Sequence, residues 1–403
     1  MIRQNFNADW TVEKGDGNSR MNSFLGNTQT KTVHLPYDAM IHEARTPDTK
    51  NGAQTGFYPG GEYIFQKHFT APQAWQGKPV SLVFEGVYQT ALVYLNGWLL
   101  TRNVNGYAEF TVEAGPYLKY GADNLLKVIA DNSLEPNSRW YTGSGIYRPV
   151  RLLVGNKVYL PQDTVRITTR EADEGFALLD VTAQVQSAST VTERVTLQQT
   201  ICREGTAVLT DRQNLLLQPG ESRTVSFRYC VDSPALWSPE NPNLYTSTMQ
   251  VLEGEEELDR EETGFGIRTL SIDAAHGVRI NGQTVKLRGA CIHHDNGILG
   301  AATLPDAEER RIRQLKEAGF NAIRSSHHPA GRALLDACDR YGVLVMDELS
   351  DVWNVRKNPY DYALYFEQDW KPTIQKMVAK DYNHPSVILY CVGNEISEAG
   401  SES

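Results

Sequence analysis

The sequence predicts two consecutive β-sandwiches followed by a parallel α/β unit. Short runs in which apolar and polar residues alternate fill residues 1–157, and the same pattern returns over residues 158–268. Over residues 269–403 the pattern changes, because apolar strands now alternate with helical stretches. These three segments fit the roughly two to four domains expected of a chain of 403 residues.

The first two segments predict all-β structure. Over residues 1–157 the alternating runs are "GEYIFQKHF", "VSLVFEG", "TALVYLNGWLL" and "NLLKVIADN", separated by Gly, Pro, Asn and Asp. Residues 158–268 continue with "FALLDVTAQVQ", "SRTVSFRYC" and "LYTSTMQVLEG". Alternation with period two between turn residues is typical of half-buried strands. The second segment also has the length of a seven-stranded immunoglobulin-like sandwich.

The third segment predicts strands and helices in turn. The strand "KLRGACIHH" precedes the helix "DAEERRIRQLKEAG", in which Ile312, Leu315 and Ala318 share one face. After them come the strand "FNAIRSSHHP", the helix "GRALLDACDRYG", the strand "VLVMDE", a helix ending in "IQKMVAKDYNHP" and the strand "SVILYC". This order is typical of parallel βα units, and four such strands are present.

Composition excludes several classes of function. A net charge of -10 disfavours nucleic acid as a partner, because binding to phosphates needs a cationic face. The sequence has no apolar run of about 18 residues and no signal-peptide core, so we expect no membrane partner and a cytoplasmic protein. The five cysteines lack CxxC spacing, which favours reduced thiols and argues against a zinc site.

Polar and titratable side chains follow all four strands of the third segment. In a βα barrel the carboxyl ends of the strands line the mouth of the active site, so we expect these side chains to converge on one cleft. They are His293, His294 and Asp295, then Arg324, Ser325, His327 and His328, then Asp347, Glu348 and Asp351, and finally Asn394 and Glu395. The pattern favours a substrate-binding site that includes Glu348 and Asp351.

Each member of this set also has a purely structural interpretation. Arg324 could pair with a structural carboxylate, and Glu348 could be its buried partner. The pair His293 and His294 could satisfy its hydrogen bonds within a loop, and Glu395 could cap a following helix. The positions of these residues at four strand ends favour a functional site.

The residue types suit sugar chemistry. A general acid must lie at the leaving oxygen with a raised pKa, which partial enclosure in an apolar mouth would provide, and Glu395 fits that role. Asn394 offers both a donor and an acceptor for a hydroxyl group. Histidine and arginine would hold further hydroxyls. Without an HExxH motif or a calcium-loop spacing, we expect no obligatory metal.

Four motifs resemble glycoside hydrolase family 2. "NAIRSSHHP" and "DYNHPSVILYCVGNE" resemble the two signatures of the family, the second of which contains its acid/base residue. "RGACIHHD" is similar to its first barrel strand, and "SRWYTGSGIYRPVRL" to the end of its N-terminal sugar-binding domain. The four motifs extend over nearly the whole chain and occur in the order that the family shows.

The resemblance implies a fold and a set of roles. It implies a jelly-roll, galactose-binding-like domain over 1–157, an immunoglobulin-like sandwich over 158–268 and the first half of a (β/α)8 TIM barrel over 269–403. Glu395 would be the acid/base and Asn394 its hydroxyl-binding neighbour. The substrate-pocket positions would be Arg324, His293 and His327, with Trp140 where the first domain reaches over the cleft.

Several positions depart from the family pattern. Tyr390 stands where Trp is usual, and Cys391 and Val392 stand near a position that is usually small. "DELSDVWN" offers Asp351 near the magnesium position of some relatives but no histidine, so we expect neither Mg nor Na to be required. The nucleophilic carboxylate is expected beyond residue 403, so the chain alone is expected to be inactive.

The resulting hypothesis is a retaining exo-β-glycosidase that removes terminal β-D-galactosyl groups from a small carbohydrate substrate. The full-length enzyme could be a homo-oligomer. The first alternative is a β-glucuronidase of the same family. The second is a non-catalytic carbohydrate-binding module, which would bind sugar without turning it over.

Overall fold

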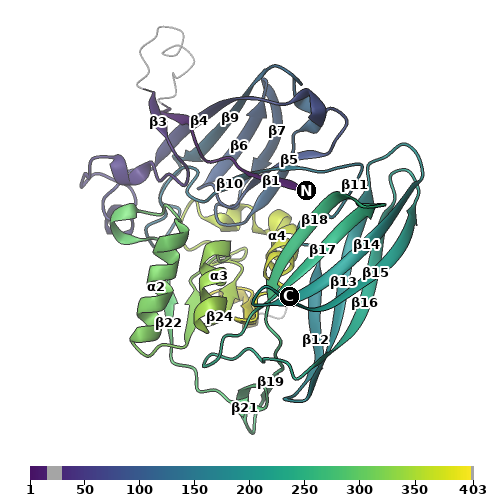
Figure 1. Ribbon diagram of the computed structural model, residues 1–403. Coiled ribbons are helices and arrows are strands. Elements are labelled where there is room, and N and C mark those ends of the chain that lie inside the picture. The colour runs from purple at the N-terminus through teal and green to yellow at the C-terminus, as the bar shows by residue number, and fades with distance from the viewer. Residues whose placement is uncertain (16–29, 401–403) are drawn as a thin grey trace.

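The computed structural model describes residues 1–15 and 30–400 and contains three regions (Figure 1). In Figure 1 the purple and blue strands form one sandwich, and the teal strands form a second sandwich beside it. The green and yellow elements form a parallel sheet with helices that contacts both sandwiches. We call these parts the first sandwich, the second sandwich and the α/β region.

The first sandwich consists of a six-stranded and a four-stranded antiparallel sheet. The strand order is β3-β2-β4-β9-β6-β7 in one sheet and β1-β10-β5-β8 in the other. The strands are β1 Ile2–Asn5, β2 Trp10–Lys14, β3 Lys31–Val33, β4 Gly61–Thr70, β5 Val80–Phe84, β6 Thr90–Leu95, β7 Trp98–Asn103, β8 Phe110–Glu113, β9 Asp123–Asn132 and β10 Val150–Val154.

One apolar core fills the space between these two sheets. Alternate residues of β9 are buried, as the period-two pattern predicts for a strand with one face inward. Trp10 and Phe65 are fully buried in this core, and the rings of Phe84 and Phe110 stack with centroids 5.1 Å apart. Burying side chains of this size contributes about 1.5–3 kcal/mol each.

The second sandwich contains two four-stranded sheets. One pairs β13 with β11, β12 and β16, and the other has the order β15-β14-β17-β18. Its core runs from Val158 to Ile267 and includes the ring pair Tyr245 and Phe265. The strands are β11 Val158–Tyr159, β12 Arg166–Ala172, β13 Phe176–Ser187, β14 Glu193–Arg203, β15 Thr206–Leu217, β16 Ser222–Asp232, β17 Tyr245–Glu253 and β18 Glu256–Phe265.

The α/β region is a parallel sheet with the order β22-β23-β24-β25. Its elements are β22 Gly289–Ile292, α2 Pro305–Glu317, β23 Ala322–Ser325, α3 Arg332–Tyr341, β24 Leu344–Glu348, α4 Phe366–Asp381 and β25 Val387–Cys391. A small antiparallel sheet precedes it, formed by β19 Leu270–Asp273, β20 Gly277–Ile280 and β21 Gln283–Thr284. The sequence patterns did not predict this small sheet.

Local sequence explains where the helices begin and end. Pro305 occupies the start of α2, where its fixed φ suits the first turn, and Asp306 and Glu308 place negative charge near the positive end of the helix dipole. Gly342 ends α3 with a φ of 66°, a left-handed conformation that glycine adopts without a Cβ clash. The chain can therefore reverse its direction directly after α3 and enter β24.

Short 3-10 helices fill the loops. They are η1 Met40–His42, η2 Gly52–Thr55, η3 Gln73–Trp75, η4 Gly115–Tyr117, η5 Gly297–Leu299, η6 Tyr362–Leu364 and η7 Ser397–Gly400. All five cysteines lie in the described residues and are free thiols. Across residues 1–15 and 30–400, we find no helix with the length and apolar character that crossing a membrane requires.

Arg332 joins all three regions. Its Nε and Nη2 atoms lie 2.8 Å from the two carboxylate oxygens of Glu109 in the first sandwich, and Nη2 also lies 2.6 Å from Asp163 at the start of the second. Burial would raise the pKa of Glu109, but Arg332 and Arg151 outweigh it and lower that pKa to about 2. The ion pairs therefore hold α3 against both sandwiches.

The second sandwich contacts the start of β25, and the loop before it, through polar groups. Arg268 Nη2 donates to the carbonyl of Val387 at 2.8 Å. Asn383 accepts from the amide of Ile167 at 2.9 Å and donates to the carbonyl of Val165 at 2.7 Å. Asn383, the last residue of "DYN" in the signature before β25, thus has a structural role at the contact with the second sandwich.

We expect Arg332→Met to destabilise the protein by about 3 kcal/mol, because the carboxylates of Glu109 and Asp163 lose the cation that they share and, among the described residues, Glu109 keeps only Arg151 as an ion-pair partner. Urea unfolding, followed by tryptophan fluorescence, measures the change as a lower midpoint. Arg332→Lys is the matched control, and its urea midpoint should lie between those of the wild type and Arg332→Met, since lysine keeps the charge but lacks the planar guanidinium. An unchanged midpoint for Arg332→Met would contradict this role.

His294 provides a pH-dependent contact between the first sandwich and the α/β region. The ring is buried, and Nε2 donates to the carbonyl of Thr142 at 2.9 Å. Burial lowers the pKa of His294 to about 3. Below about pH 6.5 His294 binds a proton in the unfolded chain but stays neutral in the folded chain. The contribution of His294 to the free energy of unfolding is therefore complete above that pH and is lost as the pH falls towards 3.

His294→Gln should therefore flatten the pH dependence of unfolding. Between about pH 6 and pH 4.5 the slope of the free energy of unfolding should fall by up to about 1.4 kcal/mol per pH unit. Urea midpoints measured across this range test the expectation. Gln76→Asn, at an exposed position of the first sandwich, carries no titrating group and is the control that should leave the slope unchanged. Parallel curves for wild type and His294→Gln would rule the effect out.

Candidate active site

The carboxyl ends of the four parallel strands face a loop of the first sandwich. Loop residues 133–149 lie between β9 and β10, and the contacts of this loop reach the ends of β22 and β25. Most of the predicted site residues meet at this junction. The site is therefore built from two regions rather than from the α/β region alone.

Arg324, at the end of β23, is held by Glu348 at the end of β24. Nε and Nη2 of the arginine lie 2.6 Å and 3.0 Å from the two carboxylate oxygens, and Nη2 also donates to Asn394 Oδ1 at 3.1 Å. The hydrogen bond with Glu348 raises the pKa of Arg324. Glu348 is fully buried, so the geometry favours the structural alternative in which it orients Arg324 from behind.

Two histidines line the same place. His327 Nδ1 lies 3.1 Å from Glu348 Oε1. His293 donates through Nδ1 to the carbonyl of Ser326 at 2.6 Å, and burial lowers its pKa. The neutral ring of His293 thus leaves Nε2 as an acceptor, and it stacks on Trp140 with centroids 4.9 Å apart.

Asp351 connects the ends of the two last strands with the loop of the first sandwich. Its Oδ1 accepts hydrogen bonds from Arg139 Nη2 at 2.6 Å, from Asn394 Nδ2 at 2.9 Å and from Lys357 Nζ at 3.0 Å. Its Oδ2 accepts from Arg139 Nε at 3.1 Å. Both oxygens of Asp351 are therefore committed to protein donors.

The pKa of Asp351 reflects these contacts. Burial alone would raise it, but the hydrogen bonds from Arg139, Asn394 and Lys357 outweigh burial and hold the pKa below its ordinary value. Asp351 is consequently a fixed anion at neutral pH.

Glu395 lies beyond the end of β25 with a φ of 47°, a left-handed conformation that is uncommon for a residue with a side chain. Its carboxylate is 70% exposed, with Oε2 3.5 Å from Arg139 Nη1, 3.5 Å from Asn394 Nδ2 and 3.8 Å from Lys357 Nζ. The expected apolar enclosure is not formed by the described residues. Polar and cationic groups surround this carboxylate instead.

Other strand-end residues lie behind the site. His294 and His328 are buried and pack around the ring of Tyr107, which stacks on His328 at 4.3 Å. Asp347 is fully buried and accepts from the amides of Ala330 and Glu348. These side chains support the site without reaching its surface.

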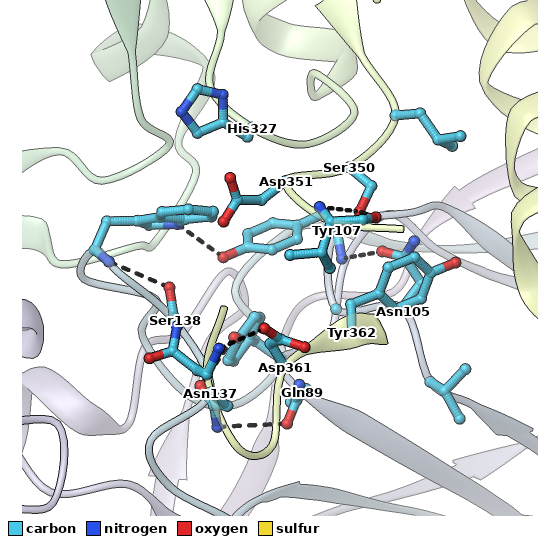
Figure 2. Close-up of a pocket in the computed structure, with 17 residues that line it drawn as sticks. Gln89, Asn105, Tyr107, Asn137, Ser138, His327, Ser350, Asp351, Asp361 and Tyr362 are labelled. Atoms are coloured by element: carbon cyan, nitrogen blue, oxygen red, sulfur yellow. Dashed lines mark hydrogen bonds between the residues drawn. The ribbon is translucent and has the colours of Figure 1, made fainter. Parts of the chain in front are cut away.

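A hollow opens beside Asp351 at the junction of the two regions (Figure 2). Figure 2 shows His327 and Asp351 at one end and Asn137 and Gln89 at the other. The hollow encloses about 50 Å³, and Trp140 and Asp351 are among its lining residues. Glu395 is not among them, so the exposed carboxylate lies outside this hollow.

Three residues that matter here were missed from the sequence. Arg139 and Lys357 contact both Asp351 and Glu395, and the hydroxyl of Tyr107 accepts from Trp140 Nε1 at 3.0 Å. Arg139 directly precedes Trp140 in the motif "SRWYTGSGIYRPVRL", so a signal was present. Lys357 and Tyr107 lie in segments without any motif.

Two places in the described part of the chain gather carboxylates that could bind a metal ion. Asp351 already contacts two cations, so it is poorly suited to bind a metal ion as well. Among the described residues, ligand atoms of Asp336, Asp339 and His384 lie within 4.8 Å of one another. His384 Nδ1 lies 2.5 Å from Asp339 Oδ2, and the amide of Ser386 donates to Asp339 Oδ1, so two of the three residues are already paired with protein groups.

Family models match nearly the whole chain in three parts. The glycosyl hydrolase 2 galactose-binding domain-like model matches residues 10–176. The glycosyl hydrolases family 2 model matches residues 158–268, and the TIM barrel domain model of the same family matches residues 274–402. The predicted fold class of two β-sandwiches and part of a TIM barrel is confirmed.

Curated relatives and solved structures agree with these matches. A β-galactosidase from Bacteroides ovatus is 37% identical over 402 residues, which is 100% of this chain and 47% of that protein. A β-glucuronidase from Bacteroides fragilis is 27% identical, covering 92% of this chain and 54% of that protein. The chain therefore spans about half the length of the curated relatives it matches.

Two solved structures show the same arrangement. The glycosyl hydrolase family 2 member from Bacteroides cellulosilyticus has a TM-score of 0.94 and 37% identity, covering 98% of this chain and 52% of that one. A β-glucuronidase from Bacteroides uniformis has a TM-score of 0.84 and 28% identity, covering 98% of this chain and 47% of that one. By its three domains and its relatives, the chain belongs to glycosyl hydrolase family 2.

Proposed function

We propose that the complete protein carrying this sequence is a retaining exo-β-galactosidase in which Glu395 is the general acid/base. The observation that carries the proposal is the position of Glu395. Its carboxylate is exposed at the carboxyl end of a barrel strand, beside the side-chain amide of Asn394, which in turn accepts a hydrogen bond from the anchored guanidinium of Arg324. The similarity to a β-galactosidase at 37% identity supports galactose as the sugar.

Retention needs two carboxylates about 5–5.5 Å apart. Glu395 would protonate the glycosidic oxygen in the first step and deprotonate water in the second. Asp351 is unsuited to be the nucleophile, because Arg139, Asn394 and Lys357 occupy both its oxygens. We place the nucleophile outside residues 1–403, as the family resemblance implies.

The remaining site residues would bind sugar hydroxyls. Arg324 is held by the buried Glu348 and donates to Asn394, so Arg324 and Asn394 form a preorganised set of donors and acceptors. His293 offers its free Nε2 as an acceptor, and His327 lies beside it with ring centroids 6.1 Å apart. Trp140 closes this side by stacking on His293.

A cytoplasmic location and homo-oligomerisation are proposals that rest on composition and on the family resemblance. Neither of them affects the assignment of Glu395.

The sugar preference is tested by hydrolysis of nitrophenyl β-galactoside and nitrophenyl β-glucuronide by the complete protein. We expect higher kcat/KM with the galactoside. A preference for the glucuronide would favour the activity named for several relatives, including the Bacteroides fragilis protein. Sugar binding without hydrolysis of either substrate would favour the non-catalytic module and overturn the proposed function.

Glu395→Gln should lower kcat/KM for phenyl β-galactoside by roughly 10²–10⁴-fold, because a poor leaving group needs the proton of the general acid. The measurement is steady-state hydrolysis by the complete protein. Glu367→Gln removes an exposed carboxyl of α4 and serves as the matched control, with no change expected. Unchanged hydrolysis in Glu395→Gln would exclude the acid/base role.

A further inference from the structure

Arg139 belongs to the first sandwich by sequence but lies in the site of the α/β region. It is part of the loop between β9 and β10, and the partners of its guanidinium are Asp351 and Glu395. Sequence separations of 212 and 256 residues from these partners mean that only the folded chain brings them together.

The guanidinium divides its nitrogen atoms between the two carboxylates. Nε and Nη2 form a fork on Asp351 at 3.1 Å and 2.6 Å, and Nη1 then lies 3.5 Å from Glu395 Oε2. Because the guanidinium is planar and rigid, fixing two nitrogens on Asp351 also fixes the direction of the third. Lysine could not reproduce this geometry, since its ammonium is a point charge on a flexible chain.

The loop that carries Arg139 is itself anchored. Buried Asp38 accepts hydrogen bonds from Tyr141 Oη at 2.6 Å, from the amide of Ser144 at 2.9 Å and from the amide of Ala301 in the α/β region at 2.8 Å. Gly143 has a φ of 68°, and a Cβ there would lie 2.5 Å from that of Ala301. The loop can therefore approach the α/β region only with glycine at this position.

Glu395 needs such a partner because little else restrains it. Its side chain is 70% exposed, and an exposed glutamate samples several rotamers. Lys357 is farther away, at 3.8 Å, and its ammonium donates at 2.7–3.0 Å to the carbonyl and carboxylate of Asp351 and to the carbonyl of Asn394. Arg139 is thus the cation whose Nη1 is available to donate to Glu395.

We propose that Arg139 is a positioning residue that aims the carboxyl of Glu395 at the glycosidic oxygen, so that the first sandwich completes the catalytic centre. The proposal rests on the proposed function, because it assumes that Glu395 is the acid/base. It adds that the sandwich holds the acid in place as well as bordering the cleft.

The test compares two galactosides in the complete protein. Departure of phenol needs protonation by Glu395, whereas departure of dinitrophenol needs almost none. Arg139→Ala should lower kcat/KM for phenyl β-galactoside by roughly 10²-fold, the cost of a misplaced catalytic group, and should leave dinitrophenyl β-galactoside nearly unchanged. Arg139→Lys should recover only part of the loss. Arg139→Gln is the second variant if Arg139→Ala misfolds, and circular dichroism reports folding.

Arg102→Ala is the matched control. Arg102 also reaches the α/β region from the first sandwich, with its guanidinium carbon 5.4 Å from the ring centroid of Tyr365. Among the described residues it forms no hydrogen bond or ion pair with Asp351 or Glu395. Its loss should affect neither substrate.

Three outcomes would overturn the inference, and they differ from one another. An equal loss on both galactosides would make Arg139 a purely structural contact between the regions. No loss on either would show that Glu395 is aimed without it. Hydrolysis of neither substrate by the wild-type protein would instead remove the proposed function on which the inference rests.

Discussion

The candidate site depends on the hydrogen bonds that the carboxylate of Asp351 accepts. This carboxylate accepts hydrogen bonds from Arg139 of the first sandwich, from Lys357 of its own loop and from Asn394 beyond β25. A largely buried anion is stable only when charged or polar donors surround it. The carboxylate of Asp351 therefore holds the side chains of Arg139, Lys357 and Asn394 close to one another. These side chains lie beside Glu395, which shares two of these cations.

The two sandwiches support the α/β region in different places. The first sandwich contacts the carboxyl ends of the strands, where Arg139, Trp140 and Asp38 act. The second sandwich contacts the start of β25 through Arg268 and Asn383. Because β25 is held at its base and at its end, the position of Glu395 depends on all three regions.

Periodicity predicted the fold class because each region has a clear pattern. Alternation marked the strands around Phe65 and Val181, and the change to strand and helix marked the α/β region. Periodicity did not predict the small sheet β19 to β21, since its strands of two to four residues are too short for a period to show. Side chains of Arg324, Glu348, Asn394 and Glu395 were placed at strand ends from sequence, and the structure brings them together.

The sequence by itself determined the family, the order of the domains and the strand ends at which polar residues gather, because periodicity and local motifs are encoded by neighbours in the chain. Only the tertiary structure decided which groups touch. It buried Glu348 behind Arg324, left Glu395 exposed rather than enclosed, and brought Arg139 to Asp351 and Glu395 across more than two hundred residues. Such contacts arise from the docking of one region on another, and no local pattern records that docking.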